Sequence, residues 1–255
     1  MLSKSKIKYI QSLERKKIRK EEGIFVAEGN KLVADMLGHF ECVMLIAKSS
    51  WLATQGDIKT NELIIAEEDD IKKASFLKTP QDVIALFKLP TYEADHIDTQ
   101  KELVIALDGI QDPGNLGTII RLADWFGIEH IVCSTDTTDA FAPKCVQSTM
   151  GALARVKVHY LDLEAYLGTQ QAPVYGTFLD GENVYEKTLT PNGILMMGNE
   201  GNGISEKMES LVSERLFIPS YPAERPTSES LNVAIATAIA CAEFRRREVY
   251  SGKSE

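Results

Sequence analysis

The second half of the chain alternates short apolar runs with helical patterns, an arrangement that few folds accommodate. Six runs have the length and composition of buried strands, at residues 102–109, 130–135, 154–160, 174–180, 193–198 and 215–220. Helical patterns occur around residues 115–126, 143–152, 205–212 and 230–247. Continuously apolar strands that alternate with helices predict a mostly parallel sheet covered on both faces. Ligands bind such sheets beyond the carboxyl ends of the strands.

The first half predicts a second, smaller α/β domain over residues 1–90. It opens with an amphipathic helical pattern and continues with short apolar strands near residues 23–29, 42–48, 62–68 and 82–90. Residues 91–102 are polar and lack an apolar period, so we interpret them as a linker. Residues 103–255 then form the larger domain.

Composition narrows the class of protein. No apolar run approaches the roughly 20 residues that cross a bilayer, and the basic start lacks the apolar core of a secretory signal. The four cysteines (Cys42, Cys133, Cys145 and Cys241) and the four histidines are widely scattered. We therefore expect buried free thiols, no metal site, no membrane association and a cytoplasmic location.

Positive charge is concentrated at the N-terminus. Residues 1–20 hold eight Lys or Arg against one Glu, a net +7 that leaves −16 for the remainder of a chain whose net charge is −9. On charge alone, a solvated helix face and a phosphate-binding patch are equally good interpretations. In the second interpretation the candidate phosphate contacts are Lys6, Lys8, Lys16, Lys17 and Arg19.

Three loops of the second half carry polar residues at the expected ligand-binding edge. In the first, Asn115 can cap the following helix, and Arg121 lies on the face opposite the apolar stripe. The second, "MMGNEGNG", is typical of a phosphate-binding turn, but Glu200 would repel a phosphate. This loop could therefore bind a neutral or a cationic ligand.

The third loop leads into the apolar helix predicted at residues 230–247. Its many alanines allow close approach, so this helix is expected to be buried or to pack in an interface. Asn232 falls in its first turn, where it could be a simple capping amide or part of a site. Taken singly, an exposed Arg121 and a capping Asn232 are ordinary structural features.

Together the segments "NLGTIIRLADWFG", "MMGNEGNG" and "IPSYPAERPTSESLNVAIATAIA" resemble the three signature motifs of the SpoU (TrmH) branch of the SPOUT methyltransferases. The resemblance covers about residues 103–247, and the first half resembles the substrate-binding domain that many members carry. It implies an enzyme that transfers a methyl group from S-adenosylmethionine to a ribose 2′-hydroxyl of ribosomal or transfer RNA. It also implies a deep trefoil knot, which nothing else in the sequence indicates.

The resemblance assigns roles to particular residues. Arg121 would activate the hydroxyl, as a base or as an electrostatic stabiliser, with Asn115, Glu200, Ser230 and Asn232 orienting it and the sugar. Backbone groups at Gly198, Ile218 and Leu231 would hold the cofactor, with Asn199 and Thr177 as further contacts. A sulfonium cofactor without phosphates also removes the objection raised by Glu200. The N-terminal lysines and Arg19 become candidate RNA contacts.

The resemblance further implies a homodimer in which the arginine of one subunit approaches the cofactor of the other. Ribosomal RNA is the better expectation than transfer RNA, by analogy. Two departures stand out: the loop at residues 218–231 is longer than in many relatives, and Gln147 replaces a frequent basic residue. The alternatives are a catalytically inactive RNA-binding relative and a dehydrogenase-like nucleotide-binding domain, which lacks support because no G-x-G-x-x-G follows the strand at residues 103–107.

Overall fold

The computed structural model describes residues 2–222, 228 and 230–250, which form two compact units. Unit 1 contains Met1–Thr91 and Asp139–Ala154, and unit 2 contains Tyr92–Thr138 and Arg155–Glu255. The sequence analysis had assigned residues 139–154 to the larger domain. They pack in unit 1 because Phe141 contacts Phe25, with ring centroids 5.0 Å apart, and Asp139 pairs with the buried Arg19 at 2.6 Å.

Unit 1 is built on a four-stranded mixed sheet of order β1-β4-β2-β3, in which only β2 and β3 are parallel. Leu13 and Ile10 of the N-terminal helix are fully buried against this sheet. The elements of the unit are α1 (Lys4–Ser12), α2 (Lys16–Glu22), β1 (Ile24–Glu28), α3 (Asn30–Met36), β2 (Cys42–Ala47), α4 (Ser49–Leu52), β3 (Glu62–Ile65), α5 (Glu68–Ala74), β4 (Val83–Lys88), α7 (Pro143–Thr149) and η2 (Ala152–Ala154).

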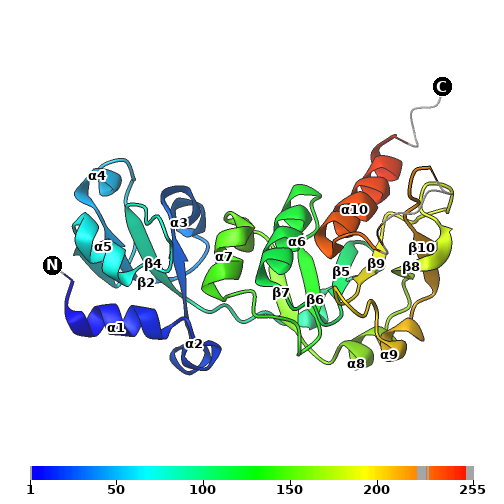
Figure 1. Ribbon diagram of the computed structural model, residues 1–255, viewed down its shortest axis with the longest axis horizontal. Coiled ribbons are helices and arrows are strands. Elements are labelled where there is room, and N and C mark those ends of the chain that lie inside the picture. The colour runs from blue at the N-terminus through cyan, green and yellow to red at the C-terminus, as the bar shows by residue number, and fades with distance from the viewer. Residues whose placement is uncertain (1, 223–227, 229, 251–255) are drawn as a thin grey trace. The chain divides into compact units, whose positions relative to one another are not determined.

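Unit 2 is built on a six-stranded sheet of order β10-β8-β9-β5-β6-β7, and every neighbouring pair is parallel (Figure 1). The predicted parallel sheet is therefore confirmed, while the implied knot stays a prediction. The elements are η1 (Ala94–His96), β5 (Leu103–Leu107), α6 (Pro113–Trp125), β6 (His130–Cys133), β7 (Lys157–Tyr160), α8 (Leu163–Gly168), β8 (Val174–Asn183), β9 (Gly193–Met197), α9 (Glu206–Glu209), β10 (Glu214–Phe217) and α10 (Val233–Tyr250).

Helices cover both faces of the unit 2 sheet, as expected for continuously apolar strands. On one face Val104 and Met196 share a core with Leu163 of α8 and Met208 of α9. On the other, the ring of Tyr175 packs edge-on against Phe244 of α10, with centroids 5.0 Å apart. Figure 1 shows α10 alongside α6 on this second face.

The expected linker is an ordered part of unit 2. Thr99 is buried and its hydroxyl donates to Gln170 Oε1 at 2.8 Å, and the ring of Tyr92 lies 5.8 Å from that of His159. All four cysteines are buried and free, which confirms that expectation. Within the described ranges, no helix is long and apolar enough to cross a membrane, and no group of three or more His, Cys, Asp or Glu is placed to hold a metal ion.

Candidate functional site

The first loop of the site runs from the end of β5 into α6. The predicted cap is wrong: Asp112 caps the helix, because its Oδ1 accepts the backbone N–H of Asn115 at 2.9 Å. Pro113 occupies the first helical position, where its missing N–H costs nothing. Asn115 therefore lies inside the first turn, and its side-chain amide is available to the neighbouring loops.

The glycine loop closes tightly on itself after β9. A Cβ at Gly198 would lie 2.1 Å from the backbone of Gly203, so only glycine fits there. Asn199 and Gly203 exchange two backbone hydrogen bonds of 2.9 Å. The Asn199 side chain accepts from the N–H of Gly201 and donates to Gly109 O at 2.7 Å. Its amide thus shapes the loop and fastens it to the end of β5.

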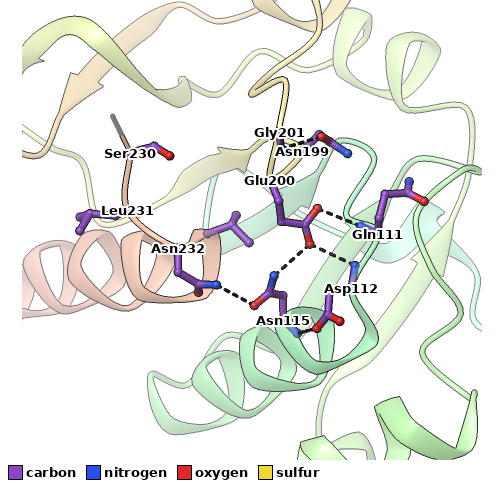
Figure 2. A pocket seen from close by; sticks show the side chains of 10 residues that line it. Gln111, Asp112, Asn115, Asn199, Glu200, Gly201, Ser230, Leu231 and Asn232 are labelled. Atoms are coloured by element: carbon purple, nitrogen blue, oxygen red, sulfur yellow. Dashed lines mark hydrogen bonds between the residues drawn. The ribbon is translucent and has the colours of Figure 1, made fainter. Parts of the chain in front are cut away.

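Glu200 joins the glycine loop to the first loop. Its carboxylate accepts the backbone N–H groups of Gln111 and Asp112, both at 3.1 Å, and the side-chain amide of Asn115 at 3.0 Å (Figure 2). Partial burial alone would raise the pKa of Glu200, but these hydrogen bonds outweigh it and the pKa is lowered. Glu200 is therefore ionised at neutral pH.

Asn232 completes this network from the third loop. Its Nδ2 donates to Asn115 Oδ1 at 2.9 Å, and its Oδ1 accepts the N–H of Ala234 at 3.0 Å at the start of α10. The capping interpretation of Asn232 is therefore confirmed, and the same side chain also joins Asn115, while its role in a site stays a prediction. Since α10 begins at Val233, the helix starts three residues later than its pattern predicted.

Two adjoining cavities open at this edge of the sheet. The more polar one has a volume of about 580 Å³ and contains four of the five predicted catalytic residues: Asn115, Glu200, Ser230 and Asn232. The other has a volume of about 510 Å³ and contains all five predicted cofactor contacts: Thr177, Gly198, Asn199, Ile218 and Leu231. Glu200, Gly201 and Leu231 line both, so the two cavities are neighbours. The roles of these residues stay predictions.

Arg121 lies outside both cavities. It is exposed on α6, and no hydrogen bond or ion pair joins its side chain to another described residue. Six residues separate it from Asn115, which places it about 9 Å further along the helix axis and on another face. Within one subunit, the structure does not bring Arg121 to the other predicted catalytic residues.

The predicted RNA contacts differ in accessibility. Arg19 is only 2% exposed, and its guanidinium donates to Leu13 O at 2.7 Å and to Asp139 at 2.6 Å. Arg19 is therefore a structural residue, and its assignment to RNA is corrected. Lys6 is half-buried and pairs with Glu62, whereas Lys8, Lys16 and Lys17 are exposed. In the lengthened loop, residues 223–227 lie outside the described residues.

Several residues of the site have no motif that could reveal them. The backbone N–H groups of Gln111 and Asp112 donate hydrogen bonds to Glu200. Any residue type except proline can provide such a group, so the sequence does not identify these two positions. Phe178, Leu179 and Glu209 also line the 510 Å³ cavity. The run at residues 174–180 predicts a plain strand, and only Thr177 of this run was expected near the cofactor.

Comparisons with known proteins agree with this site. Residues 102–242 match the SpoU rRNA Methylase family, and residues 4–85 match the MRM3-like substrate binding domain. The chain is 31% identical to the 23S rRNA (guanosine(2553)-2′-O)-methyltransferase RlmP of Bacillus subtilis, over 92% of this chain and 93% of that one. These matches cover both halves of the sequence.

The chain is also similar to solved structures of RNA methyltransferases. A TrmH-family RNA methyltransferase from Porphyromonas gingivalis has a TM-score of 0.88 and 44% identity, covering 97% of this chain and 99% of its own. The AdoMet-bound rRNA methyltransferase from Sinorhizobium meliloti has a TM-score of 0.83 and 30% identity, covering 97% and 96%. With its motifs, sheet and site in agreement, the chain belongs to the SpoU rRNA methylase family.

Proposed function

We propose that this protein transfers a methyl group from S-adenosylmethionine to a ribose 2′-hydroxyl of ribosomal RNA. The observation that carries the proposal is the hydrogen-bonded network of Glu200, Asn115 and Asn232, which joins the three family motifs at the edge of the 510 Å³ cavity. A catalytically inactive relative would have no need to preserve this polar network. The family match and the relatives named above support the same activity.

The 510 Å³ cavity fits S-adenosylmethionine. Met197, Ile204 and Leu231 supply apolar surface for an adenosine, and Gly198 brings backbone within reach of it. Glu200 and Glu209 also line the cavity, and carboxylates there favour a cationic ligand over a phosphate. When bound, this cofactor supplies an electrophilic methyl group. Gly198, Ile218 and Leu231 would hold it through backbone groups, with Thr177 as a further contact.

The 580 Å³ cavity is where the target ribose would bind. Asn115 and Asn232 present their amides at its wall, oriented by Glu200, so the sugar meets groups that are already ordered. Such positioning contributes on the order of 7–11 kcal/mol in ideal cases. As the O–CH₃ bond forms, the S–CH₃ bond would break to release S-adenosylhomocysteine, and the hydroxyl proton would pass to solvent water. Arg121, as a cation, would stabilise the developing alkoxide.

Arg121 can act there only if a second copy supplies it, so we propose a homodimer through unit 2. Beside Arg121, α6 exposes 83% of Trp125, and α10 exposes 52% of Ile235 on its own outer face. Large apolar side chains this exposed on adjacent helices are typical of an interface. Sedimentation should give a dimer at micromolar concentration. A monomer that still methylates RNA would exclude the shared site.

Unit 1 is proposed to bind the RNA, in keeping with its match to a substrate binding domain. Lys8, Lys16 and Lys17 are exposed on α1 and α2, and they would be its contacts with phosphates. RNA affinity should then fall steeply with salt. The choice of ribosomal over transfer RNA rests on the relatives' names, and a cytoplasmic location remains a prediction.

The product distinguishes the activity. A 2′-O-methyl group blocks alkaline cleavage at the following phosphodiester bond, whereas a methylated base does not. RNA labelled by the wild-type enzyme should contain alkali-resistant linkages. Labelled RNA in which every linkage remains sensitive would overturn the ribose assignment, and absence of both labelling and cofactor binding would favour the inactive relative.

Arg121→Ala tests the mechanism. Its rate should fall by about 10²- to 10³-fold, the effect of removing one preorganised electrostatic group. Affinity for S-adenosylmethionine should stay within about twofold, because Arg121 would act on the ribose hydroxyl only as charge develops in the transition state. Exposed Lys207→Ala is a matched control with unchanged rate. A fully active Arg121→Ala enzyme would exclude this role.

A further inference from the structure

One wall of the 510 Å³ cavity is an excursion of strand β8. Arg215 of β10 pairs with Gly176, but the next residue, Leu216, pairs with Glu182. Residues 177–181 therefore leave the ladder with β10. Thr177, Phe178 and Leu179 of this segment line the cavity, so the position of the excursion determines the shape of one wall.

Arg215 holds the excursion at two points. Its guanidinium lies 3.6 Å from the centroid of the Phe178 ring, and it forms an ion pair with Asp180. The same guanidinium pairs with Glu209 at 2.6 Å, and this α9 residue also lines the cavity. The ion pair with Arg215 lowers the pKa of Asp180. A single side chain thus fastens two walls of the cavity to each other.

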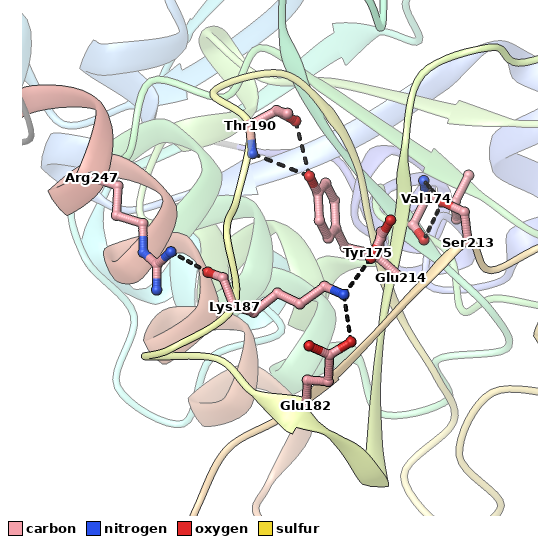
Figure 3. A network of polar contacts seen from close by, with 8 residues as sticks. All are labelled: Val174, Tyr175, Glu182, Lys187, Thr190, Ser213, Glu214 and Arg247. Atoms are coloured by element: carbon pink, nitrogen blue, oxygen red, sulfur yellow. Dashed lines mark hydrogen bonds and ion pairs between the residues drawn. The ribbon is translucent and has the colours of Figure 1, made fainter.

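The far end of the excursion is fixed by other contacts. A Cβ at Gly181 would lie 2.4 Å from the carbonyl carbon of Leu216, so the two backbones are in close contact. Lys187 Nζ lies 2.6 Å from both Glu182 and Glu214 (Figure 3). These two carboxylates raise the pKa of Lys187 to about 12. None of these residues lines the cavity. The part of the excursion that lines the cavity is around Phe178, and Arg215 is the residue that contacts it there.

We propose that Arg215 is a positioning residue that sets the affinity for the cofactor, acting through Phe178 and Glu209. The inference rests on the proposed function. Without Arg215 the carboxylates of Asp180 and Glu209 would face one another uncompensated, and the Phe178 ring would lose the group stacked on it. Both changes would move the wall away from the position that it has in this structure. The reacting atoms and the network around Glu200 would be untouched.

The test is the affinity of the full-length protein for S-adenosylmethionine, measured by calorimetry, together with methylation kinetics. Arg215→Ala should raise the Kd and the KM for the cofactor about tenfold and leave kcat within about twofold. Arg215→Lys should fall in between, since an ammonium cannot stack and bridge two carboxylates as a guanidinium does. Lys187→Ala is the matched control: it should lower the melting temperature and leave the Kd unchanged.

The outcomes separate the two proposals. A wild-type protein that fails to bind the cofactor overturns the proposed function itself. A wild-type protein that binds, with an Arg215→Ala variant of equal Kd, overturns only the role of Arg215, as does a loss confined to kcat. If Arg215→Ala does not fold, Arg215→Lys and Asp180→Asn decide by the same criterion.

Discussion

Removing the Glu200 carboxylate should separate catalysis from folding. In Glu200→Ala, the N–H groups of Gln111 and Asp112 and the amide of Asn115 lose their acceptor. Asn115 is also the acceptor for Asn232, so two of the residues proposed to orient the ribose lose their fixed positions. The change thus loosens the site without altering the core.

The magnitudes follow from exposure. A net hydrogen bond contributes about 0.5–1.5 kcal/mol, and here the freed N–H groups lie on exposed residues that water can reach. We expect unfolding to become easier by only about 1–2 kcal/mol in total. Misplacing reacting groups by about 1 Å can cost 10²-fold in rate, so kcat should fall about a hundredfold.

Glu200→Gln makes the experiment sharper. The amide keeps the shape of the side chain but places N–H groups where the carboxylate accepted hydrogen bonds, so it should be nearly as inactive as Glu200→Ala. Because the pKa of Glu200 is lowered, the carboxylate of the wild-type protein is fully ionised at both pH 6 and pH 8. The losses of rate in Glu200→Ala and Glu200→Gln should therefore be the same at these two pH values.

The assay is methyl transfer to RNA at saturating cofactor, with urea denaturation of the same samples. Glu206→Ala is the control, since Glu206 is exposed on α9 and lines neither cavity. Wild-type kcat in Glu200→Gln would refute the reasoning. The reasoning would also be refuted if the Glu200 variants lost activity only because they were largely unfolded under the assay conditions.

Three further predictions concern other parts of the chain. Gly198→Ala should abolish cofactor binding measured by calorimetry, whereas Gly168→Ala should bind normally, because its Cβ would meet nothing within 4 Å and Gly168 lines neither cavity. Arg19→Ala should cost about 3–5 kcal/mol in urea denaturation by leaving buried partners unpaired, and exposed Lys17→Ala should cost almost nothing. Burial and the neighbouring His130 lower the pKa of His159 to about 4 in the folded protein. The folded protein is therefore most stable above the ordinary pKa of 6.5, where His159 is neutral, and it loses this stability as the pH falls from 6.5 towards about 4. Melting temperatures between pH 7 and pH 4 should show this loss, and His159→Phe should reduce it.

The parts of the fold that depend on local pattern were predictable from sequence. The continuous apolar runs gave the strands of the parallel sheet, and a parallel sheet brings its carboxyl ends together. Asn115, Glu200 and Asn232 each follow such a strand or begin the helix after it, so their meeting at one edge was expected. The hydrogen bonds among them confirm that proximity.

Features that depend on distant partners could not be predicted in the same way. Arg19 has the same local sequence context as the exposed lysines around it, and one of its partners, Asp139, lies 120 residues away. The excursion at residues 177–181 is apolar at its start and looks like uninterrupted strand. Its departure from the ladder depends on Arg215 and Gly181, which no window of a few residues contains.

The membership of residues 139–154 in unit 1 has a consequence for synthesis of the chain. A nascent protein of 91 residues has all four strands of the unit 1 sheet but lacks α7, Phe141 and the partner of the buried Arg19. The missing segment is made about 60 residues later, roughly 3 to 12 s at translation rates of 5–20 residues per second. During that interval the first unit must persist on the ribosome without the Asp139 carboxylate beside Arg19 and with an uncovered aromatic face. Binding of a chaperone, or of RNA, to nascent chains should therefore be strongest before residue 154 emerges.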